Sequence, residues 1–474
     1  MKKVDMIVKA PHFYTMEGEG VGYRASGAMV VDGGKIIALE DREAVEKEYE
    51  AEEVIELKHH AVFPGFIDAH MHTGLAIMRG LAQDTSNWMM YGLQPFDNAV
   101  SEEERNAGSR LAIIEAIRAG TTTIGDFETN MEAVCSFIHK VGARGNIAYT
   151  IREAKRKVYK PGELYEFDKD MGERSFEENL RLYDKWHKKD HGRIRILFGP
   201  QGADFISKEL LLRVQKAAKE RNTKIHMHVQ QGDRETYQIM KRYGKRPIQW
   251  LKENGLLDET LIAVHLTDAT DEEAKVVAES GASMIVCPGS IGIIDGIVCP
   301  SVAFQDAGGS VALGSDQAPG NNCHNIINEM KLITLFNKIK YQDPEVMPAW
   351  KALRMATIEG ARAIGLGDII GSLEVGKRAD FIAIDLNKPT MLPLYTHPMR
   401  NIVPNLVYSA RGDEVCLSVV DGRIIYRDGK ILTIDEDKYL NEIKQYPEGI
   451  GQRASQEFFE INGTNAHFMR ENKL

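Results

Sequence analysis

The sequence predicts an α/β protein, a (β/α)8 barrel of the TIM type with a small β-sandwich built from both chain termini. Three observations support this fold class. Through the middle of the chain, strand and helix patterns alternate about eight times, which is typical of a parallel sheet closed into a barrel. Both ends of the chain show short strand patterns in succession. A length of 474 residues suits one large barrel with a satellite unit.

The strand patterns at the two ends of the chain are alike. Gly27–Val31 and Lys35–Leu39 flank Asp32-Gly33-Gly34, which predicts a hairpin turn. Similar patterns return at Ala379–Ile384 and Ser418–Tyr426. The expected units are a β-sandwich of residues 1–59 and 371–438, a barrel of residues 60–370, and a polar C-terminal tail of residues 439–474.

Eight segments are expected to form the barrel strands. In chain order they are the strand leading into His70, then Thr121–Phe127, Asn146–Ile151, Arg193–Gly199, Thr223–Val229, Thr260–His265, Ser283–Cys287 and Ser310–Ser315. Helical patterns lie between them, and capping boxes at Ser101–Glu104 and Thr270–Glu273 each predict a helix start. The charged segment Arg152–Arg174 is interpreted as a solvated insertion or as a lid over the barrel mouth. Catalytic groups of such barrels lie where strands end and loops begin.

Composition narrows the class of protein. Hydrophobic residues make up 43% of the chain, enough for a sizeable core. A formal net charge of -10 argues against a general affinity for nucleic acid or anionic membranes. The five cysteines are scattered without a CxxC pair, and no stretch approaches the roughly 20 apolar residues of a membrane span. We therefore expect a soluble cytoplasmic protein that acts on a small molecule.

Histidines stand at the ends of the predicted barrel strands. His70 and His72 follow Pro64-Gly65-Phe66-Ile67 and, being two residues apart on a strand, point to the same side. On the fifth strand His228 is nearer the C-terminal end than His226. We therefore expect His228 to face the barrel mouth and His226 to be a buried core histidine one layer deeper.

Two further polar residues complete this cluster, since the sixth strand ends at His265 and the eighth runs into Asp316. Imidazoles combined with a carboxylate favour a borderline divalent ion, with Zn²⁺ as the default and Fe²⁺, Mn²⁺ or Co²⁺ as alternatives. Such an ion lowers the pKa of a bound water from ~15.7 towards ~7, which provides hydroxide at neutral pH. Asp316 is placed to take the water's proton and hand it to a leaving group.

Several motifs spread over nearly the whole chain carry a family resemblance. They are Pro64–His72, Met78–Ala82, Ala119–Thr123, Leu313–Asp316 with Asn321-Asn322, Met355–Thr357 with Gly360–Ala363, and Gly371–Asp380. With them the chain resembles the amidohydrolase superfamily, in the branch of S-adenosylhomocysteine deaminases, guanine deaminases and chlorotriazine hydrolases. The resemblance implies His70, His72, His228 and Asp316 as metal ligands. It also implies that His265 polarises the substrate or hydrogen-bonds the metal-bound water, and that the protein is a homo-oligomer.

The departures from this branch surround the substrate rather than the metal. Gln231 stands where the deaminases carry a proton-shuttling glutamate, and an amide cannot titrate. Gln201 replaces a usual histidine, as does Asp268, and Ile291 replaces a usual asparagine. The binuclear relatives use a lysine on the fourth strand, but Arg193–Gly202 contains none, so we expect one ion. This pattern predicts retained hydrolysis with an altered substrate.

We predict an enzyme, a metal-dependent hydrolase in which metal-bound hydroxide attacks a non-peptide carbon–nitrogen bond of a small nitrogen-rich molecule. The expected catalytic residues are Asp316, His265 and Gln231. The candidate substrate contacts are Trp88, Gln201, Gln231, Asn322 and His324. Trp88 is interpreted either as a stacking platform for a flat ligand or as a packing residue under its loop. One alternative is a deaminase of an aminopurine, pyrimidine or triazine ring, and another is a non-catalytic amidohydrolase-like scaffold.

Overall fold

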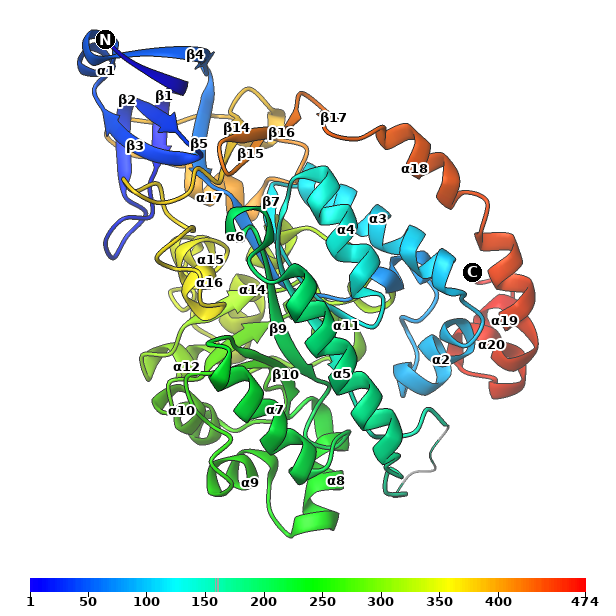
Figure 1. Ribbon diagram of the computed structural model, residues 1–474. Helices are drawn as coiled ribbons and strands as arrows, with labels where there is room; N and C mark the ends of the chain where they lie inside the picture. The colour runs from blue at the N-terminus through cyan, green and yellow to red at the C-terminus, as the bar shows by residue number, and fades with distance from the viewer. Residues whose placement is uncertain (158, 160–161) are drawn as a thin grey trace.

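Two sheets organise the computed structural model, which describes residues 1–157, 159 and 162–474 (Figure 1). The first is an eight-stranded sheet whose strands follow one another in chain order from β6 to β13. Its strands are β6 (Phe66–Met71), β7 (Thr121–Glu128), β8 (Arg144–Ile151), β9 (Ile194–Pro200), β10 (Ile225–Val229), β11 (Leu261–His265), β12 (Ser283–Val286) and β13 (Val311–Leu313). Every neighbouring pair is parallel. The predicted barrel is confirmed.

The first and last strands meet at their C-terminal ends. Met71 and Asp316 form a parallel bridge there. The backbone N–H of Asp316 donates to the carbonyl of His70 (2.8 Å), and the N–H of His72 donates to the carbonyl of Asp316 (2.9 Å). The backbone contacts that close the barrel therefore also hold three of the predicted metal ligands side by side.

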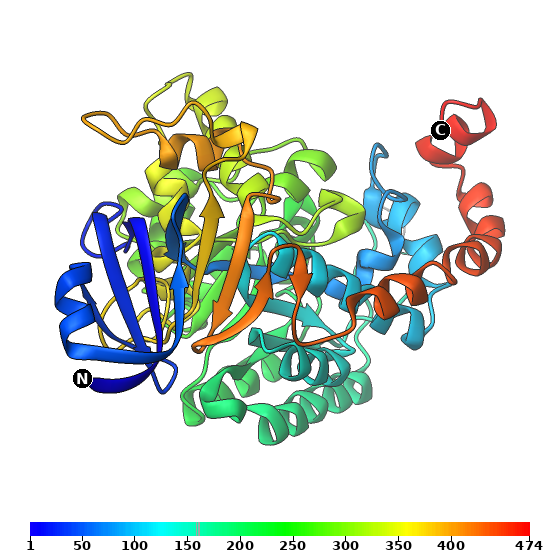
Figure 2. The ribbon, with the colours of Figure 1, turned by 90° about the horizontal axis from the view of Figure 1, so that it is seen from above.

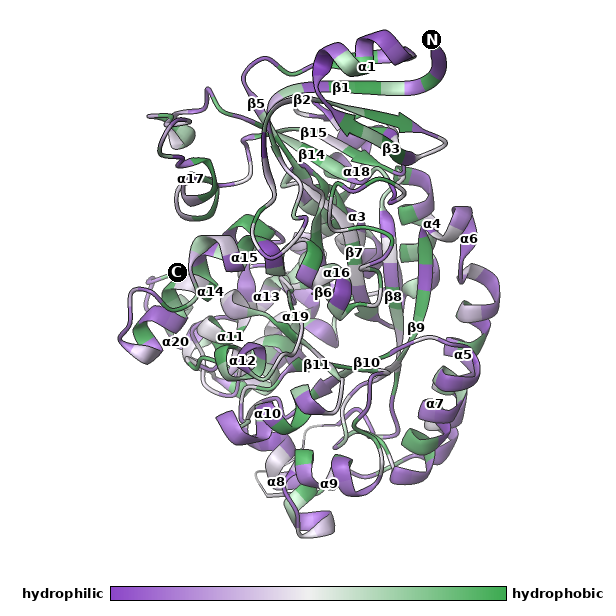
Figure 3. Ribbon diagram, turned by 90° about the vertical axis from the view of Figure 1, so that its left-hand side faces the viewer, coloured by the Kyte–Doolittle hydropathy of each residue, from purple (hydrophilic) through white to green (hydrophobic). Residues whose placement is uncertain are grey.

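Helices surround the barrel and connect its strands. They are α3 (Glu102–Arg118), α4 (Met131–Val141), α5 (Lys169–Trp186), α6 (Lys189–Gly192), α7 (Lys208–Glu220), α8 (Gly232–Tyr243), α9 (Pro247–Glu253), α10 (Asp271–Glu279), α11 (Pro288–Ile294), α12 (Ser301–Asp306), α13 (Ala318–Asn321), α14 (Ile326–Tyr341), α15 (Ala349–Met355) and α16 (Ile358–Ala363). Both predicted capping boxes are present, at the starts of α3 and α10. In Figure 3, α5 and α7 are largely hydrophilic, as expected for helices with one face in water.

The second sheet is mixed and takes strands from both ends of the chain. Its strands are β1 (Lys2–Tyr14), β2 (Tyr23–Asp32), β3 (Lys35–Glu40), β4 (Tyr49–Glu56), β5 (His60–Pro64), β14 (Phe381–Asp385), β15 (Val415–Val420), β16 (Arg423–Arg427) and β17 (Lys430–Ile431). The antiparallel pair of β5 and β14 joins the N-terminal and C-terminal strands, which lie side by side in Figure 2. The predicted hairpin between β2 and β3 turns at Gly33 and Gly34, whose positive φ values of 57° and 74° favour glycine.

One buried ion pair ties this sheet to the barrel. Arg144, the first residue of β8, donates from Nε and Nη2 to the two carboxylate oxygens of Asp380 at 2.7 and 2.9 Å. Both side chains are only 2% exposed. Asp380 also accepts a hydrogen bond from the backbone N–H of Asp421.

Three short elements lie between strands of the terminal sheet in the sequence. They are α1 (Arg42–Glu48), the 3-10 turn η3 (Pro389–Met391) and α17 (Ile402–Tyr408).

The C-terminal tail forms helices that contact the long loop after β6. These helices are α18 (Glu436–Ile443), α19 (Pro447–Ile461) and α20 (Thr464–Arg470), and the loop contains η1 (Thr73–Met78), η2 (Met89–Leu93) and α2 (Gln94–Asp97). Phe458 and Ala466 belong to a buried cluster with Met78 and Phe96. Figure 1 shows α19 and α20 beside α2. The tail therefore buttresses one side of the barrel mouth.

Candidate active site

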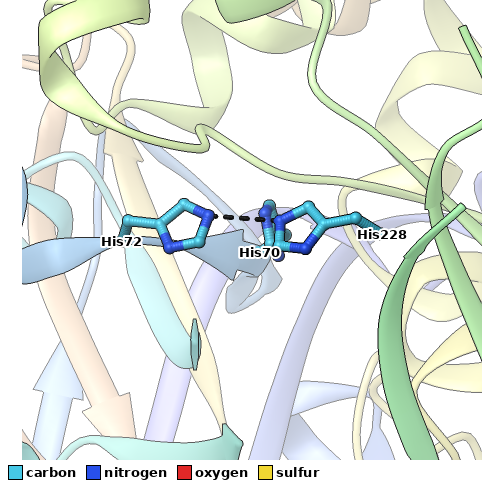
Figure 4. Close-up of side chains that lie close together, drawn as sticks. All are labelled: His70, His72 and His228. Atoms are coloured by element: carbon cyan, nitrogen blue, oxygen red, sulfur yellow. Dashed lines mark hydrogen bonds between the residues drawn. The ribbon is translucent and has the colours of Figure 1, made fainter. Parts of the chain in front are cut away.

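The C-terminal ends of the barrel strands bring the predicted polar residues together. Nε2 of His72 lies 3.3 Å from Nε2 of His228 (Figure 4). Oδ1 of Asp316 lies 3.5 Å from Nε2 of His70 and 3.5 Å from Nε2 of His72. His265 joins this cluster, since donor atoms of His70, His265 and Asp316 lie within 4.8 Å of one another. The donor atoms of His70, His72 and His228 satisfy the same limit.

The electrostatics of this cluster suit a cation. His70 is fully buried, and its Nε2 has no hydrogen-bond partner within the described residues. Burial and the neighbouring imidazoles lower the pKa of His70 and of His228 well below 6.5, so both rings are neutral and offer lone pairs. A cluster of neutral imidazoles beside a buried carboxylate is the donor set of a divalent metal site. The residues present therefore fit a divalent ion.

Outer contacts fix the orientation of the three histidines. Nδ1 of His72 donates to the carbonyl of Phe127 at 2.5 Å, and Nδ1 of His228 donates to the carbonyl of Gln201 at 2.7 Å. Nδ1 of His70 lies 2.8 Å from Nε2 of His226. In each ring the proton on Nδ1 leaves the Nε2 lone pair free for a metal. The predicted core histidine His226 is fully buried, and the structure adds that it orients His70.

Backbone strain accompanies the site. His265 has φ 80° and Asp316 has φ 60°, while Gln230 on the loop after β10 has φ 51°. Left-handed conformations are costly for residues other than glycine and concentrate at functional sites. The bends turn His265 and Asp316 off the ends of their strands and into the cluster.

Comparison with known proteins decides the family. Residues 61–425 match the amidohydrolase family. The chain belongs to the amidohydrolase family. A 5-methylthioadenosine/S-adenosylhomocysteine deaminase of Thermoanaerobacter pseudethanolicus is 32% identical over 82% of this chain and 87% of its own length. A 5'-deoxyadenosine deaminase of Methanosarcina mazei is 29% identical over 95% of this chain and 99% of its own.

Solved structures agree with this assignment. A zinc-bound adenosine deaminase from Xanthomonas campestris superposes with a TM-score of 0.87 at 26% identity, covering 95% of this chain and 99% of that one. A zinc-bound atrazine chlorohydrolase from Arthrobacter aurescens shares the fold, with a TM-score of 0.82 at 19% identity over 93% and 100% of the two chains. The amidohydrolase described here is thus a metal-dependent enzyme that hydrolyses carbon–nitrogen bonds.

Two predicted substrate contacts of this amidohydrolase serve as links within the site. Asn322 accepts from the backbone N–H of Gly80 at 2.8 Å and so connects the loop after β13 to the loop after β6. His324 is fully buried, and its Nδ1 lies 2.8 Å from Oγ of Ser315. Ser315 in turn donates to Asp68, the residue two before His70. Burial lowers the pKa of His324 to about 4. His324 therefore supports the strand that carries Asp316.

The remaining predicted contacts lie on loops at the barrel mouth. Trp88 is half-buried at the start of η2. The backbone carbonyl of Gln201 accepts the hydrogen bond from Nδ1 of His228. The buried side-chain oxygen of Gln201 has no hydrogen-bond partner in the described part of the chain. Gln231 precedes α8, and its backbone N–H donates to Glu235 at 3.3 Å. Burial raises the pKa of Glu235 to about 8. Glu235 was not predicted, because a glutamate on a helix carries no sequence signal of burial.

A narrow apolar cavity adjoins the site of this amidohydrolase. His265 and Cys287 form the wall that it shares with the polar cluster, and Ile291, Ile297, Val298 and Phe336 are among its other lining residues. Ile291 occupies the position at which the resemblance to the deaminase branch implies an asparagine. One wall of the site is therefore apolar.

The segment interpreted as an insertion or a lid has residues 158, 160 and 161 outside the described part of the chain. Its described residues contact the loop after β9 and helix α8. The ring of Tyr165 stacks on Phe205 with 5.1 Å between centroids, and its backbone N–H donates to Gln238. Whether this segment acts as a lid stays a prediction.

Across residues 1–157, 159 and 162–474, the structure has no helix with the length and apolarity that a bilayer crossing requires.

Proposed function

We propose that this amidohydrolase is a hydrolytic deaminase of a small, neutral, nitrogen-rich ring, with an adenine-type base as the first candidate. The observation that carries the proposal is the cluster of His70, His72, His228 and Asp316 beside His265 at one end of the barrel. Relatives named as adenosine-type deaminases match 82–95% of the chain, which supports the substrate class.

One divalent ion, with zinc as the first choice, would be held by His70, His72, His228 and Asp316. When bound there, the ion supplies a water of lowered pKa, near ~7. The carboxylate of Asp316 accepts a proton from the attacking water and then donates that proton to the leaving amine. His265 is neutral because burial lowers its pKa to about 4. Its ring can therefore polarise the substrate by a hydrogen bond to a polar atom beside the attacked carbon.

Amides provide the polar recognition in this proposal. Gln201 has a buried oxygen without a partner among the described residues, so it can accept an N–H of the substrate. Gln231 stands at the start of α8, close in sequence to His228, and orients a ring nitrogen without exchanging a proton. The half-buried ring of Trp88 offers a stacking surface for a flat base. The apolar wall at Ile291 favours a short apolar substituent rather than a charged one.

A second candidate reaction is hydrolysis of an amide, urea or carbamate carbon. Gln231 favours it, because an amide at this position cannot protonate a ring nitrogen, and these substrates do not require that step. Asp316 alone would then handle the proton between water and leaving group. The non-catalytic scaffold considered from the sequence is set aside, because the family match and the deaminase relatives indicate an enzyme.

The experiment begins with metal analysis of the purified full-length chain, followed by ammonia release from two sets of compounds. One set contains 5'-deoxyadenosine, methylthioadenosine and guanine, and the other contains ureido and carbamate compounds. Ammonia from the first set, lost on Asp316→Asn, supports deamination. Turnover of the second set alone would replace it with the second candidate. A protein that holds no ion and turns over neither set would contradict both candidate reactions.

We also propose a cytoplasmic homo-oligomer. The five cysteines are all free thiols, which suits a reducing compartment. Sedimentation of the purified chain would test the oligomeric state, and a single species at the 53.1 kDa chain mass would refute it.

A further inference from the structure

A second cavity lies at the opposite end of the barrel from the candidate active site. It opens between the N-terminal ends of β8 and β9 and the edge of the terminal sheet, and its volume is about 260 Å³. Its charged and titratable lining residues are Lys35, Arg144, His191, Arg195, Asp368 and Arg378. The amidohydrolase reaction proposed above makes no use of this cavity.

The lining of the cavity is cationic although the whole chain carries a net charge of -10. Lys35, Arg144, Arg195 and Arg378 face a single lining carboxylate, that of Asp368. Clefts lined by one sign of charge concentrate ions of the opposite sign. The cavity therefore attracts small anions against the field of the rest of the protein.

Two of these cations already have partners. Arg144 makes its paired hydrogen bonds to Asp380, and Nε of Arg378 lies 3.3 Å from Oδ1 of Asp421. These pairs hold the guanidinium groups in fixed positions at the wall of the cavity. They also neutralise part of the charge, so the free donors must come from other residues.

Arg195 and Lys35 are the cations left without partners. Neither side chain makes a hydrogen bond or an ion pair within residues 1–157, 159 and 162–474. Nε of Arg195 is buried and has no acceptor there. Burial and the nearby charge of Arg144 lower the pKa of Arg195, so its surroundings already disfavour another positive charge. Buried donors without acceptors are costly, and an anion would relieve both the missing acceptor and the repulsion.

We infer that this cavity binds a small phosphate-bearing anion between Arg195 of the barrel and Lys35 of the terminal sheet. Arginine forks match the oxygens of phosphate, and lysine adds a point charge from the other side. Because the two residues belong to different sheets, the anion would join the barrel to the terminal sheet. Binding would then raise the stability of the folded chain with increasing anion concentration.

The test uses the full-length chain with its metal. Isothermal titration and thermal unfolding are measured with inorganic phosphate, pyrophosphate and glycerol 3-phosphate, each against sodium chloride of equal ionic strength. We expect saturable binding and a melting temperature that rises with concentration. A preference for glycerol 3-phosphate would assign the site to an organic phosphate, and a preference for phosphate or pyrophosphate would assign it to the inorganic ion. An effect that chloride reproduces would overturn the inference.

Variants locate the site. Arg195→Met should weaken binding about 10–100-fold, because each charge-assisted hydrogen bond lost is worth about one to two factors of ten. Lys35→Met should weaken it less, and Arg195→Lys should keep part of it. The matched controls are Arg174→Met and Lys252→Met, exposed residues away from the cavity. If Arg195→Met binds the anion as tightly as the control Arg174→Met does, the inference is overturned. It is also overturned if the variants Lys35→Met and Arg195→Lys each bind the anion as tightly as the parent.

Discussion

The contact between His226 and His70 allows a quantitative test of the metal site. In His226→Leu, Nδ1 of His70 loses its acceptor at 2.8 Å, so the ring no longer has a fixed tautomer or orientation. Loss of such an outer contact typically weakens metal binding 10–100-fold, or about 1.4–2.7 kcal/mol. His226→Gln keeps an acceptor oxygen at this position, so it should lose much less affinity.

The assay is a competition titration of zinc between each variant and a chromogenic chelator, at a pH near 7. Circular dichroism confirms that both variants are folded, since His226 is fully buried and its replacement also alters the core. We expect the parent to bind zinc most tightly, His226→Gln less tightly and His226→Leu least tightly. If folded His226→Leu holds zinc as tightly as the parent, His70 is not a ligand oriented by His226, and the assigned metal site is wrong.

Three further predictions follow from named contacts. Arg144→Met should lower the free energy of unfolding by about 3–5 kcal/mol in urea titrations, because it leaves the buried Asp380 carboxylate unpaired. Burial lowers the pKa of His324 from 6.5 to about 4. The unfolded chain therefore binds a proton at this histidine before the folded chain does, and the free energy of unfolding falls as the pH falls from ~6.5 towards ~4. His324→Leu should lose less unfolding free energy than the parent between about pH 7 and about pH 5. Gln231→Glu should raise ammonia release from aminopurines.

Each of these predictions has an outcome that contradicts it. A loss below about 1 kcal/mol in Arg144→Met would show that the ion pair does not tie the barrel to the terminal sheet. Parallel pH profiles of His324→Leu and the parent would show that His324 is not buried as a neutral ring. If Gln231→Glu abolishes native turnover and gains nothing on aminopurines, the amide makes a hydrogen bond specific to another substrate.

The barrel could be predicted because local patterns specify it. Ser101 shows this most clearly, since its side chain caps α3 while its backbone N–H donates to Glu104 at 2.8 Å, as the S-x-x-E motif predicts. The eighth strand was predicted at Ser310–Ser315 but ends at Leu313. The difference has a physical cause, because the chain bends into a positive φ at Asp316. Sequence patterns give strand positions well and backbone bends poorly.

The partners of the site residues could not be predicted in the same way. His226 and His70 are 156 residues apart, and nothing in the fifth strand says which ring a deeper histidine will meet. The carbonyl of Phe127, which holds His72, leaves no trace in the sequence because every residue has one. The strand-end rule places the predicted ligand residues at one end of the barrel, but the orientation of their side chains depends on tertiary contacts that leave no local sequence pattern.

The docking of the C-terminal helices has a practical consequence for handling this protein. Nδ2 of Asn465 donates to the carbonyl of Gln83, and Arg453 forms an ion pair with Glu104 at the start of α3. Trimming the chain ahead of α19, a common step before crystallisation, would expose Phe96 and release the stretch that carries Trp88. Versions of the chain that lack these helices are therefore unsuitable for substrate screening.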